Sequence, residues 1–116
     1  MLKDGKYKIT FKTPVGEGGG FMIMESGKMV GGDSDYIYDG SYYKKGNATK
    51  ARILIDNYSG RKTSIFGAAK YIWLKAVYSE TKDSKGFAGK AFVVDVTPEI
   101  PGVEGTMIPL FGKLLD

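Results

Sequence analysis

Hydrophobic and polar residues alternate with a period of two along most of this chain, which is typical of β-strands with one buried face. The alternation is clearest in residues 6–13 and 49–56. Their apolar phase holds Tyr7, Ile9, Phe11, Ala51, Ile53 and Ile55. No long stretch shows the 3.6-residue period of an amphipathic helix, so the pattern predicts an all-β protein.

Turn signals divide the chain into short segments of this kind. Ser26-Gly27, Lys45-Gly46-Asn47 and residues 82–86 each favour a tight turn. The pattern predicts strands over residues 6–13, 18–25, 28–30, 36–43, 49–56, 71–79 and 87–97, with 106–115 as a last strand or short terminal segment. Gly40 indicates a bend or bulge inside its strand. Residues 98–105, with two prolines, predict a loop, and residues 67–69 allow one helical turn.

About eight short strands in sequential hairpins favour one domain, residues 1–116, built as a single small antiparallel β-barrel. A closed barrel is favoured over a sandwich because closure removes exposed strand edges. A barrel of about eight strands is either filled by side chains or holds one small ligand.

One apolar phase is expected to point into the barrel, as an ordinary packed core or as a cavity for a small apolar ligand. The expected cavity residues are Tyr7, Ile9, Phe11, Phe21, Ile23, Ile53, Ile55, Trp73, Phe92 and Val94. Residues 21–24 are apolar in both phases, so this strand is expected to be covered on both sides. Met22, Met24 and Met29 are candidates for an adaptable pocket or interface.

Composition removes most catalytic chemistry from consideration. The 116-residue chain has no cysteine and no histidine, which excludes thiol catalysis and every Ser-His dyad. Glycine-rich residues 16–20 lack the spacing of a nucleotide-binding loop. Asp33, Asp35 and Asp39 do not match the spacing of a calcium loop. We therefore expect no enzyme activity, no catalytic residues, no metal and no cofactor.

The charge balance is mildly basic, with a net charge of +4. No apolar run approaches the ~20 residues of a membrane span, and the chain does not begin with a signal-peptide pattern, so we expect a cytoplasmic protein without membrane contact. Basic residues near aromatic ones are typical of surfaces that stack single-stranded nucleic acid. The cluster comprises Lys44, Lys45, Lys50, Arg52, Arg61 and Lys62, beside Tyr42, Tyr43 and Tyr58. The modest net charge and interspersed acidic residues argue against that role.

The first third of the chain carries a longer composite pattern. The segments KDGKYKITF (3–11), GEGGGFMIMESGKMVGGD (16–33) and YDG (38–40) together resemble the GrlR family of negative regulators, which are linked to type III secretion in enteric bacteria. Residues 92–96, FVVDV, are similar to a late strand of that family.

The resemblance implies a lipocalin-like (calycin-type) barrel that forms a homodimer, has no enzyme activity and binds a transcriptional activator protein rather than DNA. The family's regulator uses an exposed Glu-Asp-Glu-Asp loop for that contact. The corresponding stretch here reads Lys44-Lys45-Gly46-Asn47, so its charge is reversed. Rim charges determine partner choice. The candidate partner loop is therefore Tyr43, Lys44, Lys45, Gly46 and Asn47.

Three functional hypotheses follow. The leading one is a non-enzymatic regulator that binds a partner protein. The second is a carrier or sensor of a small apolar ligand held inside the barrel. The third is single-stranded nucleic-acid binding on a basic face.

Overall fold

The computed structural model of the chain describes residues 3–13, 16–60, 69–83 and 85–115. Its strands are β1 (Gly5–Thr13), β2 (Gly16–Glu25), β3 (Lys28–Gly32), β4 (Ile37–Lys45), β5 (Ala48–Asp56), β6 (Tyr71–Glu80), β7 (Gly86–Thr97) and β8 (Met107–Leu114). Every predicted strand is confirmed, and no predicted end differs from the observed one by more than two residues. The predicted loop over residues 98–105 is also confirmed. The helical turn considered for residues 67–69 falls largely outside the described residues.

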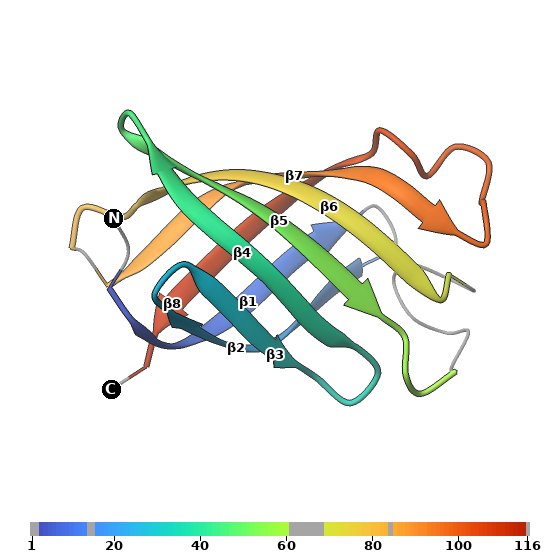
Figure 1. The fold of residues 1–116 in the computed structure, drawn as a ribbon, viewed down its shortest axis with the longest axis horizontal. Helices are drawn as coiled ribbons and strands as arrows, with labels where there is room; N and C mark the ends of the chain where they lie inside the picture. The colour runs from blue at the N-terminus through green and yellow to red at the C-terminus, as the bar shows by residue number, and fades with distance from the viewer. Residues whose placement is uncertain (1–2, 14–15, 61–68, 84, 116) are drawn as a thin grey trace.

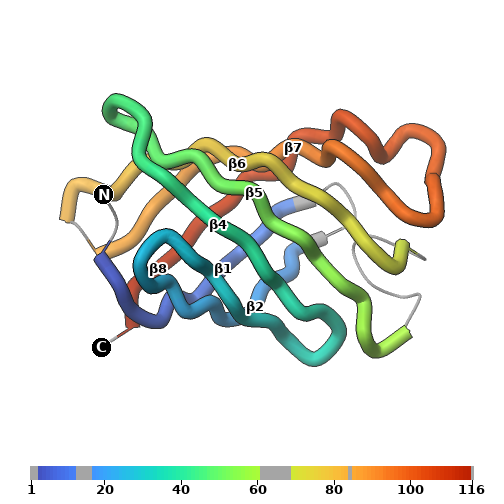
Figure 2. Tube along the Cα trace, in the orientation of Figure 1, coloured from blue at the N-terminus to red at the C-terminus, as the bar shows by residue number. Residues whose placement is uncertain are grey.

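The eight strands form one closed antiparallel barrel, which confirms the predicted fold class. Each strand pairs with the next, and β8 returns to pair with β1 (Figure 1). In that view β2 and β3 lie on the lower side of the barrel and β6 and β7 on the upper side. The Cα trace in Figure 2 follows the same course without a crossover.

The β2–β3 hairpin turns in two residues, as the sequence predicts. Ser26 has φ 50° and Gly27 has φ 83°, and Glu25 pairs directly with Lys28. Two consecutive positive φ angles are the pattern of a type I′ turn, whose twist matches that of the flanking strands.

The irregularity expected at Gly40 lies elsewhere. Pairing of β4 with β3 and β5 runs without a break through Gly40. Glycine is needed there because a Cβ would lie 2.4 Å from the Arg52 carbonyl oxygen. The register shift occurs in β7 instead, where Trp73 pairs with Asp95 but Leu74 pairs with Val93. Val94 is therefore the extra residue of a β-bulge.

The interior of the barrel contains only part of the expected inward set. Tyr7, Ile9, Phe11, Ile53 and Ile55 are buried, as predicted. The prediction is wrong for Phe21, Ile23, Phe92 and Val94, which are exposed, and for Trp73, which is half-buried on the outer side. The neighbours Met22, Met24, Ile72, Leu74, Ala91 and Val93 are buried instead.

The physical reason is that β2 is apolar in both phases at residues 21–24, and that the outward phases of β6 and β7 carry large apolar residues beside Lys75 and Lys90. A shift of one residue moves every side chain of a strand to the other face. Alternation therefore cannot decide which phase is buried when both phases are apolar. Pairing with the neighbouring strands decides it.

Candidate functional site

Aromatic rings fill much of the barrel interior. The ring centroids of Tyr78 and Phe87 lie 4.6 Å apart, and those of Tyr7 and Phe87 lie 5.7 Å apart. Phe11 meets the Tyr38 ring edge-on at 5.7 Å. Such packing is typical of a rigid core.

The Tyr38 hydroxyl anchors the turn between β3 and β4. It donates a hydrogen bond of 2.6 Å to Asp33 Oδ2. Asp33 Oδ1 accepts from the backbone N–H groups of Asp35 and Tyr36, each at 2.8 Å. Burial, followed by the contact with Asp33, raises the pKa of Tyr38 far above its usual value. These contacts give Asp33 a structural role.

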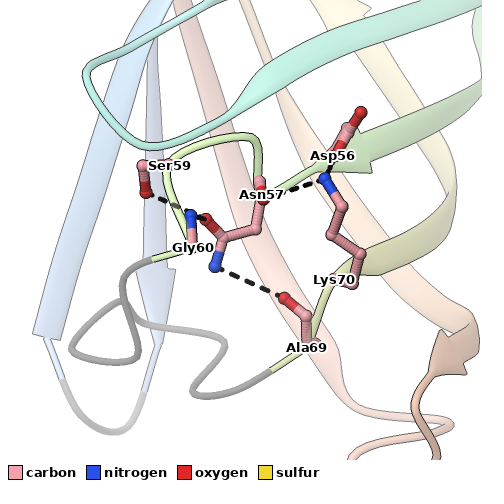
Figure 3. A network of polar contacts seen from close by, with 6 residues as sticks. All are labelled: Asp56, Asn57, Ser59, Gly60, Ala69 and Lys70. Atoms are coloured by element: carbon pink, nitrogen blue, oxygen red, sulfur yellow. Dashed lines mark hydrogen bonds and ion pairs between the residues drawn. The ribbon is translucent and has the colours of Figure 1, made fainter.

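A second polar network joins the chain after β5 to the chain before β6 (Figure 3). The buried Asn57 amide oxygen accepts hydrogen bonds from Ser59 Oγ at 3.0 Å and from the Gly60 N–H at 3.1 Å. Lys70 Nζ contacts Asp56 Oδ1 at 2.5 Å and donates to the Asn57 carbonyl at 3.1 Å. The network holds that end of the barrel in shape.

Three cavities lined by described residues open on the surface of the barrel. One of about 720 Å³ lies where the β6–β7 turn meets the end of β8, between Lys82 and Lys113. One of about 330 Å³ lies over β1 and β2, beside Phe21. One of about 310 Å³ lies in the loop after β7, around Ile100. None of these three is lined by the packed rings of the interior.

The candidate partner loop forms the tip of the β4–β5 hairpin. Lys45 pairs with Ala48, so the turn consists of Gly46, at φ 63°, and Asn47. All five residues of the loop are exposed, and Tyr43 is 58% exposed. The structure therefore keeps these residues together and accessible.

Four cations lie beside this hairpin on the outer face of β5, β6 and β7. Lys50 and Lys90 flank Val77 from its two neighbouring strands. Arg52 stands directly opposite Lys75. We call this surface the basic wall and define it as Lys50, Arg52, Lys75 and Lys90 with the aromatic residues Tyr43, Trp73 and Phe92.

The three aromatic residues of the basic wall are interleaved with its cations. The Arg52 guanidinium lies 4.7 Å from the centroid of the Trp73 ring, a cation–π contact. Phe92 pairs with Lys75, and Tyr43 pairs with Lys50. Acidic residues limit the wall along one side, because Asp95 pairs with Trp73.

The facing cations are unfavourable for the isolated chain. Like charges directly opposite on adjacent strands destabilise a sheet. Neither Arg52 nor Lys75 forms an ion pair within the described part of the chain. A local conflict of this kind is most often found at functional sites.

The sequence located only part of the basic wall. Lys44, Lys45, Lys50 and Arg52 do lie beside Tyr43, but Tyr42 is buried inside the barrel. Tyr58 lies at the other end of β5, where its hydroxyl donates to the Asp33 carbonyl at 2.9 Å. Arg61 and Lys62 lie outside the described residues.

The contributions of β6 and β7 were missed. Lys75 and Lys90 are 23 and 38 residues beyond Arg52 in sequence and join it only through strand pairing. The sequence did contain a signal, because Lys75 shares a phase with Trp73 in β6 and Lys90 shares a phase with Phe92 in β7. The signal was missed because Trp73 and Phe92 were assigned to the interior.

The described residues contain no group of three or more acidic side chains that could hold a metal ion. Nor do they include a helix with the length and apolar character needed to span a membrane. Comparison with models of known protein families finds no match, and comparison with curated proteins finds none either. We therefore infer function from the geometry and charge of the chain itself.

Proposed function

We propose that this chain is a non-enzymatic regulatory protein that acts by binding a partner protein through the basic wall and the partner loop. The observation that carries the proposal is the facing pair Arg52 and Lys75 beside exposed aromatic rings. An acidic segment of a partner would neutralise these charges and remove their mutual repulsion.

Arg52 and the three aromatic residues of the basic wall favour a protein partner. Arginine and aromatic side chains are enriched in protein interfaces, and they supply most of the strongly contributing contacts. Apolar Val77 lies between Lys50 and Lys90. Asp95 at the border would repel a phosphate backbone that continued across the wall.

The resemblance of residues 3–40 to the GrlR family points in the same direction. That family is a set of non-enzymatic regulators that act through protein contact. Here the corresponding loop is basic rather than acidic. The partner surface is therefore expected to be acidic. Because the charge of the loop is reversed, we expect a partner protein that differs from the partner of the family.

The carrier hypothesis has less support. Five of its expected cavity residues are exposed or half-buried on the outer side of the barrel. The others pack within a core that also contains Tyr38, Tyr78 and Phe87. Binding inside the barrel would require these rings to separate.

The proposal can be tested with Trp73, the only tryptophan of the chain. Its fluorescence is titrated with a glutamate-rich peptide that contains leucine and with an oligothymidylate. We expect the peptide to change the emission with an affinity that falls as salt rises. The variant Lys75→Glu/Lys90→Glu should bind at least about tenfold more weakly, because two positive charges of the site are reversed.

The matched control is Lys82→Glu/Lys113→Glu, which changes the net charge equally but at the cavity where the β6–β7 turn meets the end of β8. It should keep the peptide affinity within about twofold, since rim charges act mainly at short range in salt. An equal loss in both variants would show a general charge effect and contradict the proposal. Tighter binding of the oligothymidylate than of the peptide would favour the nucleic-acid hypothesis instead.

A further inference from the structure

The outer face of β1 and β8 carries a second pair of facing cations. Lys8 on β1 pairs with Lys113 on β8. Both side chains are exposed, and neither forms an ion pair within the described part of the chain. Like charges directly opposite one another destabilise a sheet. As at the basic wall, this local conflict indicates a functional surface, and a bound anion would relieve it.

The cavity of about 330 Å³ over β1 and β2 lies on this face, next to Lys8. Phe21 lines it, is 46% exposed and pairs with Lys8. Thr10 and Glu17 also line the cavity. The volume falls within the range of small-molecule sites. The cavity therefore combines a cation, an aromatic ring and a carboxylate in a space suited to one small ligand.

Lys6 supports the Phe21 ring from outside the cavity. Its Nζ lies 4.9 Å from the centroid of that ring, a cation–π contact. Lys6 pairs with Ile23, on the side of Phe21 toward the β2–β3 turn, and it does not line the cavity. The cavity extends the other way along β2, to Glu17. The contact with Lys6 therefore leaves the cavity side of Phe21 open to a second planar group.

The floor of the cavity beside Phe21 is backbone. Gly19 lies between Phe21 and Glu17 on the outward phase of β2 and pairs with Thr10. A Cβ at Gly19 would lie 2.1 Å from the Ile9 carbonyl oxygen, so the packing of the two strands requires glycine there. No side chain can fill this position, and the space next to the ring stays open.

We infer that this cavity binds a nucleotide whose base carries an exocyclic amine. The base would stack on Phe21, which is how aromatic side chains hold bases in other proteins. The phosphate would lie between Lys8 and Lys113, because neighbouring strands are only about 4.8 Å apart and both ammonium groups can reach one anion. Glu17, at the far end of the cavity, would accept a hydrogen bond from the amine.

Two observations favour a single nucleotide over a nucleic-acid strand. Among the described residues that line the cavity, Phe21 is the only aromatic one, so it offers a platform for one base. Glu17 would repel a phosphate backbone that continued along β2. Recognition by side chains does not require the glycine spacing of a phosphate-binding loop, which residues 16–20 lack. The inference does not rest on the proposed function, because the basic wall lies on β5, β6 and β7.

The first test is calorimetric titration of the chain at low salt with adenosine 5′-monophosphate, adenosine and inorganic phosphate. The nucleotide should bind at least about tenfold more tightly than either part, because only the nucleotide contacts both the ring and the cations. Its affinity should fall as salt rises. Uridine 5′-monophosphate, whose base has no exocyclic amine, should bind at least about threefold more weakly.

The second test uses variants at exposed positions, with folding checked by circular dichroism. Phe21→Leu should weaken nucleotide binding about tenfold, because it keeps an apolar side chain but removes the flat ring, whereas Phe21→Tyr should preserve binding. Lys8→Gln/Lys113→Gln should also weaken it about tenfold. The matched controls Phe92→Leu and Lys90→Gln, on the basic wall, should stay within about twofold of the wild type.

Four results would overturn the inference. The first is no binding of the nucleotide at millimolar concentration. The second is inorganic phosphate that binds as tightly as the nucleotide, which would leave only an anion site. The third is an equal loss of binding in the controls. The fourth is an oligoadenylate that binds more tightly than the nucleotide and is lost in Phe21→Leu, which would assign the face to single-stranded nucleic acid. Binding of the acidic peptide, read at Trp73, should be the same with and without the nucleotide.

Discussion

Buried tyrosines hold the interior of this barrel together, and their hydroxyl groups make the fold sensitive to alkaline pH. The pKa values of Tyr7, Tyr38, Tyr42 and Tyr78 are all raised, with burial as the largest cause. At Tyr38 the hydrogen bond to Asp33 adds to this effect. Ionisation of any of these groups would place a phenolate in the packed core.

The free energy of unfolding should therefore be constant up to about pH 10 and fall above it. In the unfolded chain tyrosine loses its proton near pH 10, whereas the folded chain keeps the proton to higher pH. Above pH 10 the unfolded state binds fewer protons, so stability decreases as pH rises. The slope should reach about 1.4 kcal/mol per pH unit for each of Tyr38 and Tyr78. Denaturant unfolding at a series of pH values measures it.

Tyr78→Phe provides the matched control. The Tyr78 hydroxyl is buried without a hydrogen-bond partner among the described residues, so its removal should be neutral or stabilising at pH 7. Above pH 10 the free energy of unfolding of the variant should fall less steeply with pH than that of the wild type, and the difference should correspond to about one proton. A wild-type stability that stays flat from pH 9 to about 12 would refute the prediction.

Strand pairing determines where charge collects on the surface. Arg52 on β5 and Lys75 on β6 face each other only because of the β5–β6 register. Lys75→Glu should therefore stabilise the isolated chain by about 0.2–1 kcal/mol, as a like-charge pair becomes an opposite-charge pair. The same substitution should weaken binding of the acidic peptide. Chemical denaturation and Trp73 titration of one variant would measure both effects.

Lys90→Glu serves as the comparison, because Lys90 faces Val77 and Pro109 rather than a cation. It should weaken peptide binding without the same gain in stability. If Lys75→Glu were no more stable than Lys90→Glu, the Arg52–Lys75 pair would carry no measurable cost. The basic wall would then lose its main indication of function.

Prediction from sequence succeeded at strands whose outer phase is mainly polar and failed at strands whose outer phase also carries large apolar residues. In β1 and β5 lysines and arginine mark the outer face, so Tyr7, Ile9, Ile53 and Ile55 were assigned correctly to the interior. In β2 residues 21–24 are apolar in both phases, and in β6 and β7 large apolar residues share the outer phase with Lys75 and Lys90, so the assignments of Phe21, Trp73 and Phe92 were wrong. The bulge at Val94 also reverses the alternation of inward and outward residues within β7, and the local sequence does not predict this.

At the scale of the whole molecule, the barrel separates two surfaces. The exposed apolar side chains Phe21, Ile23, Val30 and Ile37 lie on β2, β3 and β4. The cations of the basic wall lie on β5, β6 and β7, and Figure 1 labels all of these strands. The acidic partner of the proposed function would therefore bind on one side of the barrel.

The sequence by itself determined the strands, the tight turns and the closed barrel, because these depend on local alternation, on glycine at turns and on the avoidance of free edges. Only the tertiary structure decided which apolar phase of β2, β6 and β7 is buried, and therefore which residues meet on the surface. The physical reason is that both phases of these strands carry large hydrophobic residues, even where Lys75 and Lys90 mark the outer phase, so local alternation does not separate the two choices. The register of the closed sheet selects one, and it thereby assembles the basic wall.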